Sequence, residues 1–204
     1  KKKESVTHMK KYKLTCKVNG AEKPVIISEQ DSMNACINDY KSLLRTYNPK
    51  YVEIQRKKAG DGEWMHLEVT VHAKSHYLCN SADISPKPCN QMSVHIIVYK
   101  GYPLKRIKVF LPSDRYLASP NVFTSGGACI DTYIPLKSNL ITVVDKVVND
   151  MIHNPSVTNY KSPANAALID WHKRGVQAGT FPTMPPHLLY RSDEVALPVQ
   201  RKKS

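Results

Sequence analysis

A single cysteine in a glycine-rich segment is the residue of this chain best suited to do chemistry. Cys129 follows Gly126-Gly127-Ala128 within the stretch 119–131, which carries few charges. Small residues before the sulfur leave room for a substrate, and glycines let backbone amides approach a carbonyl closely. The stretch has neither helical nor strand periodicity, so we expect a surface loop, where functional residues concentrate. Cys129 is therefore a candidate nucleophile; the alternative is a small buried residue at the edge of a sheet.

No histidine lies in a sequence context that indicates a base for Cys129, although a Cys–His hydrolase needs one. Without a base the substrate must already be activated. A thioester meets that condition, because one thiolate then replaces another, and the site has to position the nucleophile and stabilise the developing oxyanion. Asn121 carries a side-chain amide suited to that task or to bracing the loop. The alternative for Asn121 is a turn-forming residue after Pro120.

Other cysteines and histidines are weaker candidates. His76, Cys79, Cys89 and His95 are the residue types of a zinc site. Nine residues separate the two cysteines, however, which matches no compact zinc finger, so loop and strand residues with no shared role are favoured. Cys36 falls on the apolar face of a predicted helix, where we expect it to pack and not to react.

The charge balance indicates an acidic partner. The net charge is +13 and the pI is about 9.5, which suits nucleic acid, an anionic membrane or an acidic protein. A solvated surface with two basic tails is the alternative. No apolar run approaches the ~20 residues of a membrane span, and no motif of a nucleic-acid reader is present. The odd number of cysteines, five, and the lack of an export signal favour a cytoplasmic protein.

The first part of the chain predicts a hairpin and a helix. Residues 12–18 alternate apolar and polar side chains, Asn19-Gly20 is a strong turn signal, and residues 25–27 are apolar again. Asp31 and Ser32 are good N-cap residues for a helix. Its apolar face comprises residues 33, 36, 37, 40, 43 and 44, and Asn48-Pro49 ends it.

The middle of the chain predicts an antiparallel meander. Strands are expected at 51–58, 65–71, 94–99 and 107–111. Tight links join these strands, except for a Ser-, Pro- and Asn-rich loop at 75–91. In the second strand, apolar and polar residues alternate, which indicates one buried face.

Two further helices are expected after the cysteine segment. Thr142 begins the first, with Asp145 as its capping-box partner, and Asn154-Pro155 ends it. Ser162 is the N-cap of the next helix and Gly175 its C-cap.

The resulting fold class is α+β, with helices segregated to the ends of an antiparallel sheet. We expect three parts. Residues 1–30 form a basic N-terminal extension with a β-hairpin, 31–175 form the core, and 176–204 form a proline-containing basic tail that is docked or disordered.

Three motifs together resemble the ubiquitin-conjugating enzyme family. The segment 102–109, which begins Tyr102-Pro103, resembles the family's Tyr-Pro strand motif. Ser119-Pro120-Asn121 is similar to its His-Pro-Asn motif, and Gly127-Ala128-Cys129-Ile130-Asp131 to its Gly-x-Cys-Leu-Asp active-site motif. Asn121 precedes Cys129 by eight residues, which is a spacing found in the family. The resemblance covers about residues 31–175 and includes the order of helices and strands.

The resemblance implies a function for each motif. Cys129 would accept a ubiquitin-like modifier as a thioester from an activating enzyme and pass it to an amine, usually a lysine, of a target protein. No cofactor is implied for this chain, because the activating enzyme uses the ATP. Asn121 would have the family's structural or oxyanion role. Ser162, with Asn159 as the second choice, would act on the incoming lysine.

Departures from the family pattern indicate a divergent, bacterial member. Ser119 replaces the motif's His, and Lys105-Arg106 replaces the usual prolines of a loop that ligases grip. The usual Trp after the cysteine segment is absent, and Tyr133 or Ile134 would fill its volume. A catalytically silent scaffold that binds a ubiquitin-like protein, and a basic nucleic-acid-binding module, are the alternatives.

The N-terminal hairpin has no place in the minimal family fold. Hairpin followed by helix is also similar to the first half of a ubiquitin-like β-grasp, but the strands after the helix fit the conjugating fold better. We expect an added hairpin that extends the sheet or docks a partner.

Overall fold

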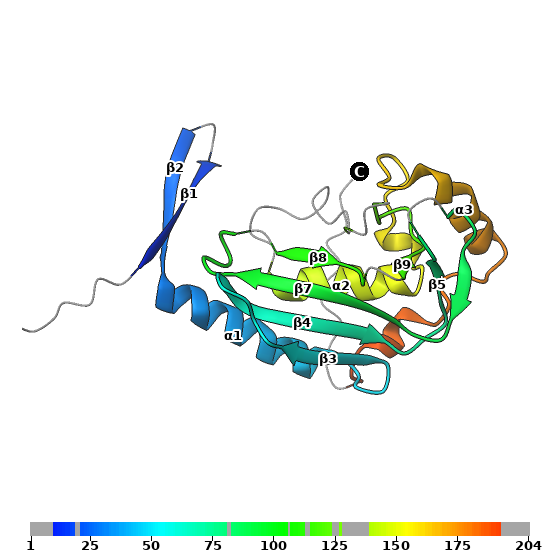
Figure 1. The fold of residues 1–204 in the computed structure, drawn as a ribbon, viewed down its shortest axis with the longest axis horizontal. Coiled ribbons are helices and arrows are strands. Elements are labelled where there is room, and N and C mark those ends of the chain that lie inside the picture. Colours follow the sequence, from blue (N-terminus) through cyan, green and yellow to red (C-terminus); the bar gives the residue numbers. More distant parts are fainter. Residues whose placement is uncertain are drawn as a thin grey trace, which may run out of the picture.

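The structure, a computed structural model, describes residues 10–18, 21–80, 83–105, 107–112, 115–123, 127 and 139–192; residues 14–18 and 21–23 are described by their backbone. In this part of the chain the fold is α+β, with three α-helices and antiparallel sheets. The largest sheet has four strands. Figure 1 shows it at the centre, with a small sheet and a short helix at one end and a hairpin that stands away at the other.

The N-terminal hairpin is confirmed. Strands β1 (Lys11–Val18) and β2 (Ala21–Ser28) pair in register from Lys11 opposite Ser28 to Val18 opposite Ala21. The predicted turn at residues 19–20 lies outside the described residues. At the foot of the hairpin the Tyr12 hydroxyl donates to Glu29 (3.4 Å). The Tyr12 ring also lies against Gly101, where a Cβ atom would be 3.1 Å from its Cγ.

Helix α1 (Glu29–Thr46) begins earlier than predicted. Its N-cap is Ser28, whose hydroxyl accepts from the Asp31 backbone N–H (3.1 Å), so the caps proposed at Asp31 and Ser32 are wrong. Ser28 ends strand β2 with an extended backbone, the conformation an N-cap requires, and the helix therefore follows the strand directly. Ser32 is instead buried and accepts from Trp64 Nε1 (2.8 Å) and from the backbone N–H of Gly101 (3.0 Å).

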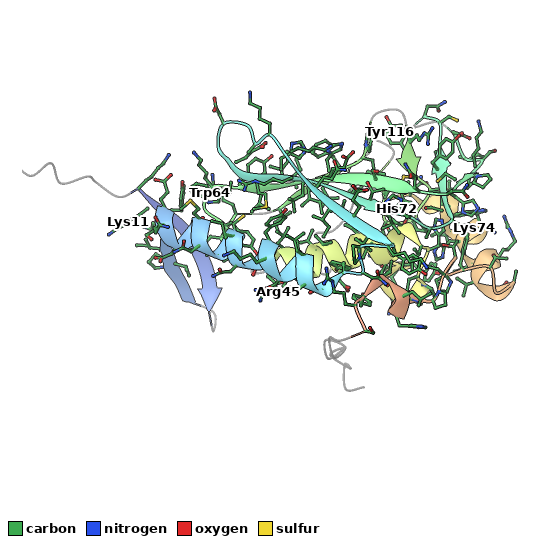
Figure 2. The ribbon with its side chains drawn as sticks, turned by 90° about the horizontal axis from the view of Figure 1, so that it is seen from below. Lys11, Arg45, Trp64, His72, Lys74 and Tyr116 are labelled. Atoms are coloured by element: carbon green, nitrogen blue, oxygen red, sulfur yellow. The ribbon has the colours of Figure 1, made fainter. Side chains whose placement is uncertain are left out.

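The predicted meander is confirmed. The strands are β3 (Val52–Lys57), β4 (Glu63–Val71), β7 (Met92–Tyr99) and β8 (Lys108–Phe110), hydrogen-bonded in the order β3-β4-β7-β8. The alternating residues of β4 are fully buried, as predicted: Met65, Leu67, Val69 and Val71. Figure 2 shows helices α1 and α2 side by side beneath one face of this sheet, with Trp64 on the side of α1.

The expected loop at 75–91 contains two strands, so that prediction is wrong. Strand β5 (Ser75–Leu78) pairs with β6 (Lys87–Cys89) and with β9 (Tyr116–Leu117) in the order β6-β5-β9. Pro88 is tolerated because β6 is an edge strand that pairs on one side alone. The proline- and serine-rich composition therefore hid a short edge strand.

Helix α2 (Leu140–Met151) carries the predicted apolar face: Val143, Val144, Val147, Val148 and Met151 are buried. Its N-cap, however, is Asn139, which accepts from the Thr142 backbone N–H (2.9 Å). The predicted capping box of Thr142 and Asp145 is wrong, because the Asp145 carboxylate accepts instead from the Tyr190 hydroxyl. That contact ties the C-terminal segment to the helix.

The third helix, unlike the first two, starts later than predicted. A 3₁₀ turn, η2 (Ala166–Leu168), leads into α3 (Ile169–Gln177), so Ser162 is not its N-cap. The Pro120 carbonyl accepts from the N–H groups of Ala164 (2.8 Å) and Asn165 (3.0 Å), which holds this segment against the loop and outside the helix. Gly175 lies within α3 and is not its C-cap.

The C-terminal segment is docked as far as Ser192. Two further 3₁₀ turns, η1 (Pro155–Val157) and η3 (Pro186–Leu189), lie between α2 and Ser192. Phe181 and Leu189 are buried, and Tyr190 forms a bridge with Tyr47 at the end of α1. In the part of the chain that the structure describes, no helix combines the length and hydrophobicity needed to span a bilayer.

Candidate functional site

The segment that leads to the candidate nucleophile runs from strand β9 along the end of helix α2. Ser119 and Asn121 are buried within it. Beyond them the Phe123 N–H donates to the Gly127 carbonyl (2.8 Å), and Gly127 bridges to Phe110 at the end of β8. Cys129 itself lies outside the described residues, so its role stays a prediction.

The side chain of Asn121 is held by three hydrogen bonds. Its Nδ2 donates to Asp150 Oδ1 (3.0 Å) and to the carbonyl of Val157 (3.1 Å), and its Oδ1 accepts from the N–H of Asn159 (2.9 Å). An amide has two N–H donors, and both are used inside the protein. This arrangement braces the loop, and in it no donor of Asn121 is left for an oxyanion.

Asp150 is the buried acceptor at the centre of these contacts. It lies near the C-terminus of α2, and Ser119 Oγ donates to its Oδ1 (2.7 Å). Ser119 Oγ in turn accepts from the backbone N–H of Asn121 (3.0 Å). Burial raises the pKa of the Asp150 carboxyl to about 6, opposed by the hydrogen bonds from Ser119 and Asn121 and by the charge of Lys146.

Asn159 and Ser162 belong to one turn that is joined to Asn121. Asn159 Oδ1 accepts from the N–H groups of Lys161 and Ser162 (both 3.1 Å), and its Nδ2 donates to the Ser162 carbonyl (2.9 Å). Asn159 is buried, whereas Ser162 is exposed. The structure therefore links Asn121, Asn159 and Ser162, which were predicted from distant stretches of the sequence, into one hydrogen-bonded network.

Sequence reasoning missed Asp150. A usable signal was present, since Asp150 falls at helical spacing from Val143 and Val147, on the stripe of α2 that is otherwise apolar. A carboxylate on a buried face is expected to have specific partners, because burying an unpaired charge is costly. Ser119 and Asn121 are those partners.

Three of the four residues weighed as zinc ligands have side-chain partners outside that set. His76 Nδ1 lies 3.2 Å from His153 Nε2, and His95 Nδ1 lies 3.0 Å from His66 Nε2. Cys79 Sγ accepts from Lys87 Nζ (3.0 Å). Among the residues with described positions, no group of three or more His, Cys, Asp or Glu side chains is arranged to hold a metal ion.

Cys36 is confirmed as a packing residue. It is 1% exposed and belongs to the main hydrophobic core. Burial raises the pKa of its thiol to about 11, with a further upward contribution from Asp39. Because the thiolate is the reactive form, this cysteine is unsuited to nucleophilic chemistry.

Comparisons with known proteins return a single kind of match. No family model matches this sequence, and no curated protein matches it. Among solved structures, the crystal structure of the H. polymorpha ubiquitin conjugating enzyme Pex4p in complex with the soluble domain of Pex22p is similar. The similarity has 15% sequence identity and a TM-score of 0.42, and it covers 76% of this chain and 90% of that chain.

Proposed function

We propose that this chain accepts a ubiquitin-like modifier as a thioester on Cys129 from an activating enzyme and transfers it to an amine of a target protein. The observation that carries the proposal is the anchoring of the Ser119-Pro120-Asn121 motif. Asn121 is 4% exposed and its side chain makes three internal hydrogen bonds, so the segment that leads to Cys129 starts from a firmly held residue. A nucleophile must be held in position to react efficiently.

The order of elements supports the same function. Helix α1, the four-stranded meander, the cysteine segment and helices α2 and α3 follow one another as the resemblance to conjugating enzymes leads us to expect. The hairpin β1–β2 is an addition at the front of this arrangement. The bacterial origin expected from the motif departures stays a prediction.

The chemistry consists of two acyl transfers. In the first, the Cys129 thiolate attacks the carbonyl carbon of the modifier's thioester, and the activating enzyme's thiol leaves. In the second, an amine nitrogen attacks the new thioester, the C–S bond breaks, an amide forms, and the amine's proton restores the Cys129 thiol. The ATP is used by the activating enzyme, so the proposal requires no cofactor on this chain.

Asn121 and Ser162 have different proposed roles in these steps. With both N–H groups of its amide engaged, Asn121 acts as a brace for the loop. Ser162 is exposed and lies in a turn that the Asn159 side chain holds in place. A residue that contacts the incoming amine must be both accessible and fixed in position, and Ser162 meets both conditions.

A short peptide thioester that ends in Gly-Gly tests the reactivity of Cys129 without knowledge of the natural modifier. We expect one peptide adduct by intact-mass spectrometry, removed by added thiol and absent in Cys129→Ala. Cys79→Ala is the matched control, because Cys79 is an exposed thiol outside the proposed site and its removal should leave the adduct unchanged. An equal yield of adduct on Cys129→Ala overturns the proposal. Loss of reactivity with retained binding of a ubiquitin-like protein would instead indicate a silent scaffold.

A further inference from the structure

Asp150 is a carboxylate sealed inside the molecule where helix α2 ends. It is 5% exposed, and its Oδ1 receives two hydrogen bonds from neutral donors, Ser119 Oγ (2.7 Å) and Asn121 Nδ2 (3.0 Å). Neither residue contributes a positive charge to balance it. Burying a carboxylate whose direct hydrogen-bond donors are neutral costs stability, and such residues concentrate at functional sites, so Asp150 is a candidate functional residue.

The contacts of Asp150 lead outward to the surface. The hydrogen bond from Nδ2 fixes which way the Asn121 amide faces, and this places Asn121 Oδ1 opposite the N–H of Asn159 (2.9 Å). Asn159 then holds the 159–162 turn through its own side chain. A chain of hydrogen bonds thus runs from the buried carboxylate to exposed Ser162.

Ser119 closes this network on the buried side. Its hydroxyl donates to Asp150 and accepts from the Asn121 backbone N–H (3.0 Å), so one side chain ties the carboxylate to the start of the motif. Ser119 and Asn121 of the motif therefore both donate to one acceptor atom of helix α2, Asp150 Oδ1.

We propose that Asp150 is a positioning residue for the transfer of the acyl group to the amine. It acts through Asn121 and Asn159 on the 159–162 turn, and its ionised form keeps that turn in the geometry that receives the amine. The inference rests on the proposed function. It distinguishes the two steps, because in the proposed function the turn contacts the amine of the second transfer, whereas the first transfer needs the Cys129 thiolate and the donor thioester.

The ionisation of Asp150 supplies a measurable signature. Hydrogen bonds to an ionised acceptor are roughly twice as strong as those to a neutral one, so protonation loosens the network. Burial raises the pKa of the Asp150 carboxyl to about 6. The charge of Lys146, on the same helix, acts in the opposite direction and lowers this pKa. The segments packed against it, 119–121 and 155–159, contain only residues without ionisable side chains. The network should therefore tighten between about pH 5 and pH 7.

The test compares the wild-type chain with Asp150→Asn in two stages. Each protein is first charged with the Gly-Gly peptide thioester, and the yield is measured by intact mass. The charged proteins are then mixed with Nα-acetyl-lysine at several pH values, and the loss of the adduct to the amide product is followed. The wild-type rate constant is then divided by that of Asp150→Asn at each pH. The ionisation of the amine affects both rate constants equally, so its effect cancels in this ratio.

We expect equal charging and a ratio of discharge rates that changes with pH. The ratio should be near one at pH 5 and rise to on the order of tenfold at pH 7.5, with its midpoint near 6. Ser119→Ala removes a hydrogen bond that lowers the pKa of Asp150, so its own pH dependence should shift upward. Asp145→Asn is the matched control: it is a partly buried carboxylate of the same helix that contacts Tyr190 instead, and its ratio to wild type should be flat.

The outcomes distinguish this inference from the proposed function. If the wild-type chain does not charge, both are wrong. If it charges, but the ratio for Asp150→Asn is flat with pH or equals that of Asp145→Asn, Asp150 has no positioning role and the proposed function stands. Circular dichroism at pH 5 and pH 7.5 verifies that each variant is folded at both ends of the profile.

Discussion

Asp150 lowers the stability of the fold when it is ionised, and the ionised form is the one proposed to assist the reaction. Burial favours its protonated form, so the ionised carboxylate is held in the fold against a free-energy cost. Residues of this kind concentrate at functional sites, where proteins accept lower stability for activity. Its position next to Asn121 agrees with that expectation.

The cost predicts how stability depends on pH. Because the folded pKa of Asp150 is raised to about 6, the native state binds more protons than the unfolded state between about pH 4 and pH 6, and this residue's contribution to stability falls as the pH rises through that range. Two pKa units correspond to about 3 kcal/mol. Relative to Asp150→Asn, the wild type should lose about that much free energy of unfolding between pH 4 and pH 7.

Urea unfolding at both pH values measures this difference. Buried His153 and His172 have lowered pKa values and act in the opposite direction, so the comparison with Asp150→Asn is needed to isolate the carboxylate. Asp170→Asn, a change at an exposed carboxylate on α3, is the control. A pH-independent difference between wild type and Asp150→Asn would show that Asp150 is not titrating in this range.

For single residues, the sequence predicted which ones matter better than it predicted which partners they contact. Cys36 was expected to pack, and it does, because apolar periodicity reports burial directly. Asn121, Asn159 and Ser162 could be singled out, but their connection could not, since it depends on Asp150 and on backbone atoms far away in the chain. Periodicity carries no information about such partners.

At the scale of elements, helix α3 is joined to the C-terminal segment by a close contact at a glycine. A Cβ atom on Gly175 would lie 2.3 Å from Phe181 Cδ2 and 2.4 Å from Cε2. The Phe181 ring packs among four other rings. Its centroid lies 4.4 Å from His153, 5.0 Å from Trp171, 5.4 Å from His172 and 5.5 Å from His76. Displacing it would disturb the whole cluster.

Gly175→Ala should therefore destabilise the protein by about 1–3 kcal/mol, the usual cost of overpacking. The sign of the change in stability tests the packing argument, because replacing Gly by Ala within an unobstructed helix stabilises a protein by about 1 kcal/mol. Gly60→Ala is the matched control, with only the flexible Glu63 side chain near its Cβ at 3.4 Å, and should stay within about 0.5 kcal/mol of wild type. Urea unfolding that shows Gly175→Ala more stable than wild type would contradict the packing argument.

The errors in the predicted elements have two causes. Helix starts were displaced because Asp31, Ser32, Thr142 and Ser162 are chemically good caps, while Ser28 and Asn139 had the backbone geometry. Strands β5 and β6 were hidden because short edge strands tolerate Pro and Ser. Long, strongly periodic segments such as β4 and α2 were predicted correctly, since burial of one face dictates their pattern.

At the scale of the whole molecule, the chain is a two-layer core with an addition at one end. Figure 1 shows the hairpin β1–β2 extending from the start of α1, away from the sheet. The exposed residues Lys10, Lys11 and Lys13 contribute to the net charge of +13. At the other end the chain from α3 to Ser192 is packed on the body, which composition alone left open between docked and disordered.

The most direct test of the central claim is charging by the cell's own machinery. The tagged chain is incubated with an extract of its source cells, with and without ATP, and analysed on a non-reducing gel and by intact mass. We predict an ATP-dependent adduct that added thiol removes, that Cys129→Ala lacks, and that becomes a thiol-resistant ester or disappears in Cys129→Ser. An adduct of equal yield on Cys129→Ala, or no adduct on the wild-type chain, would contradict the account.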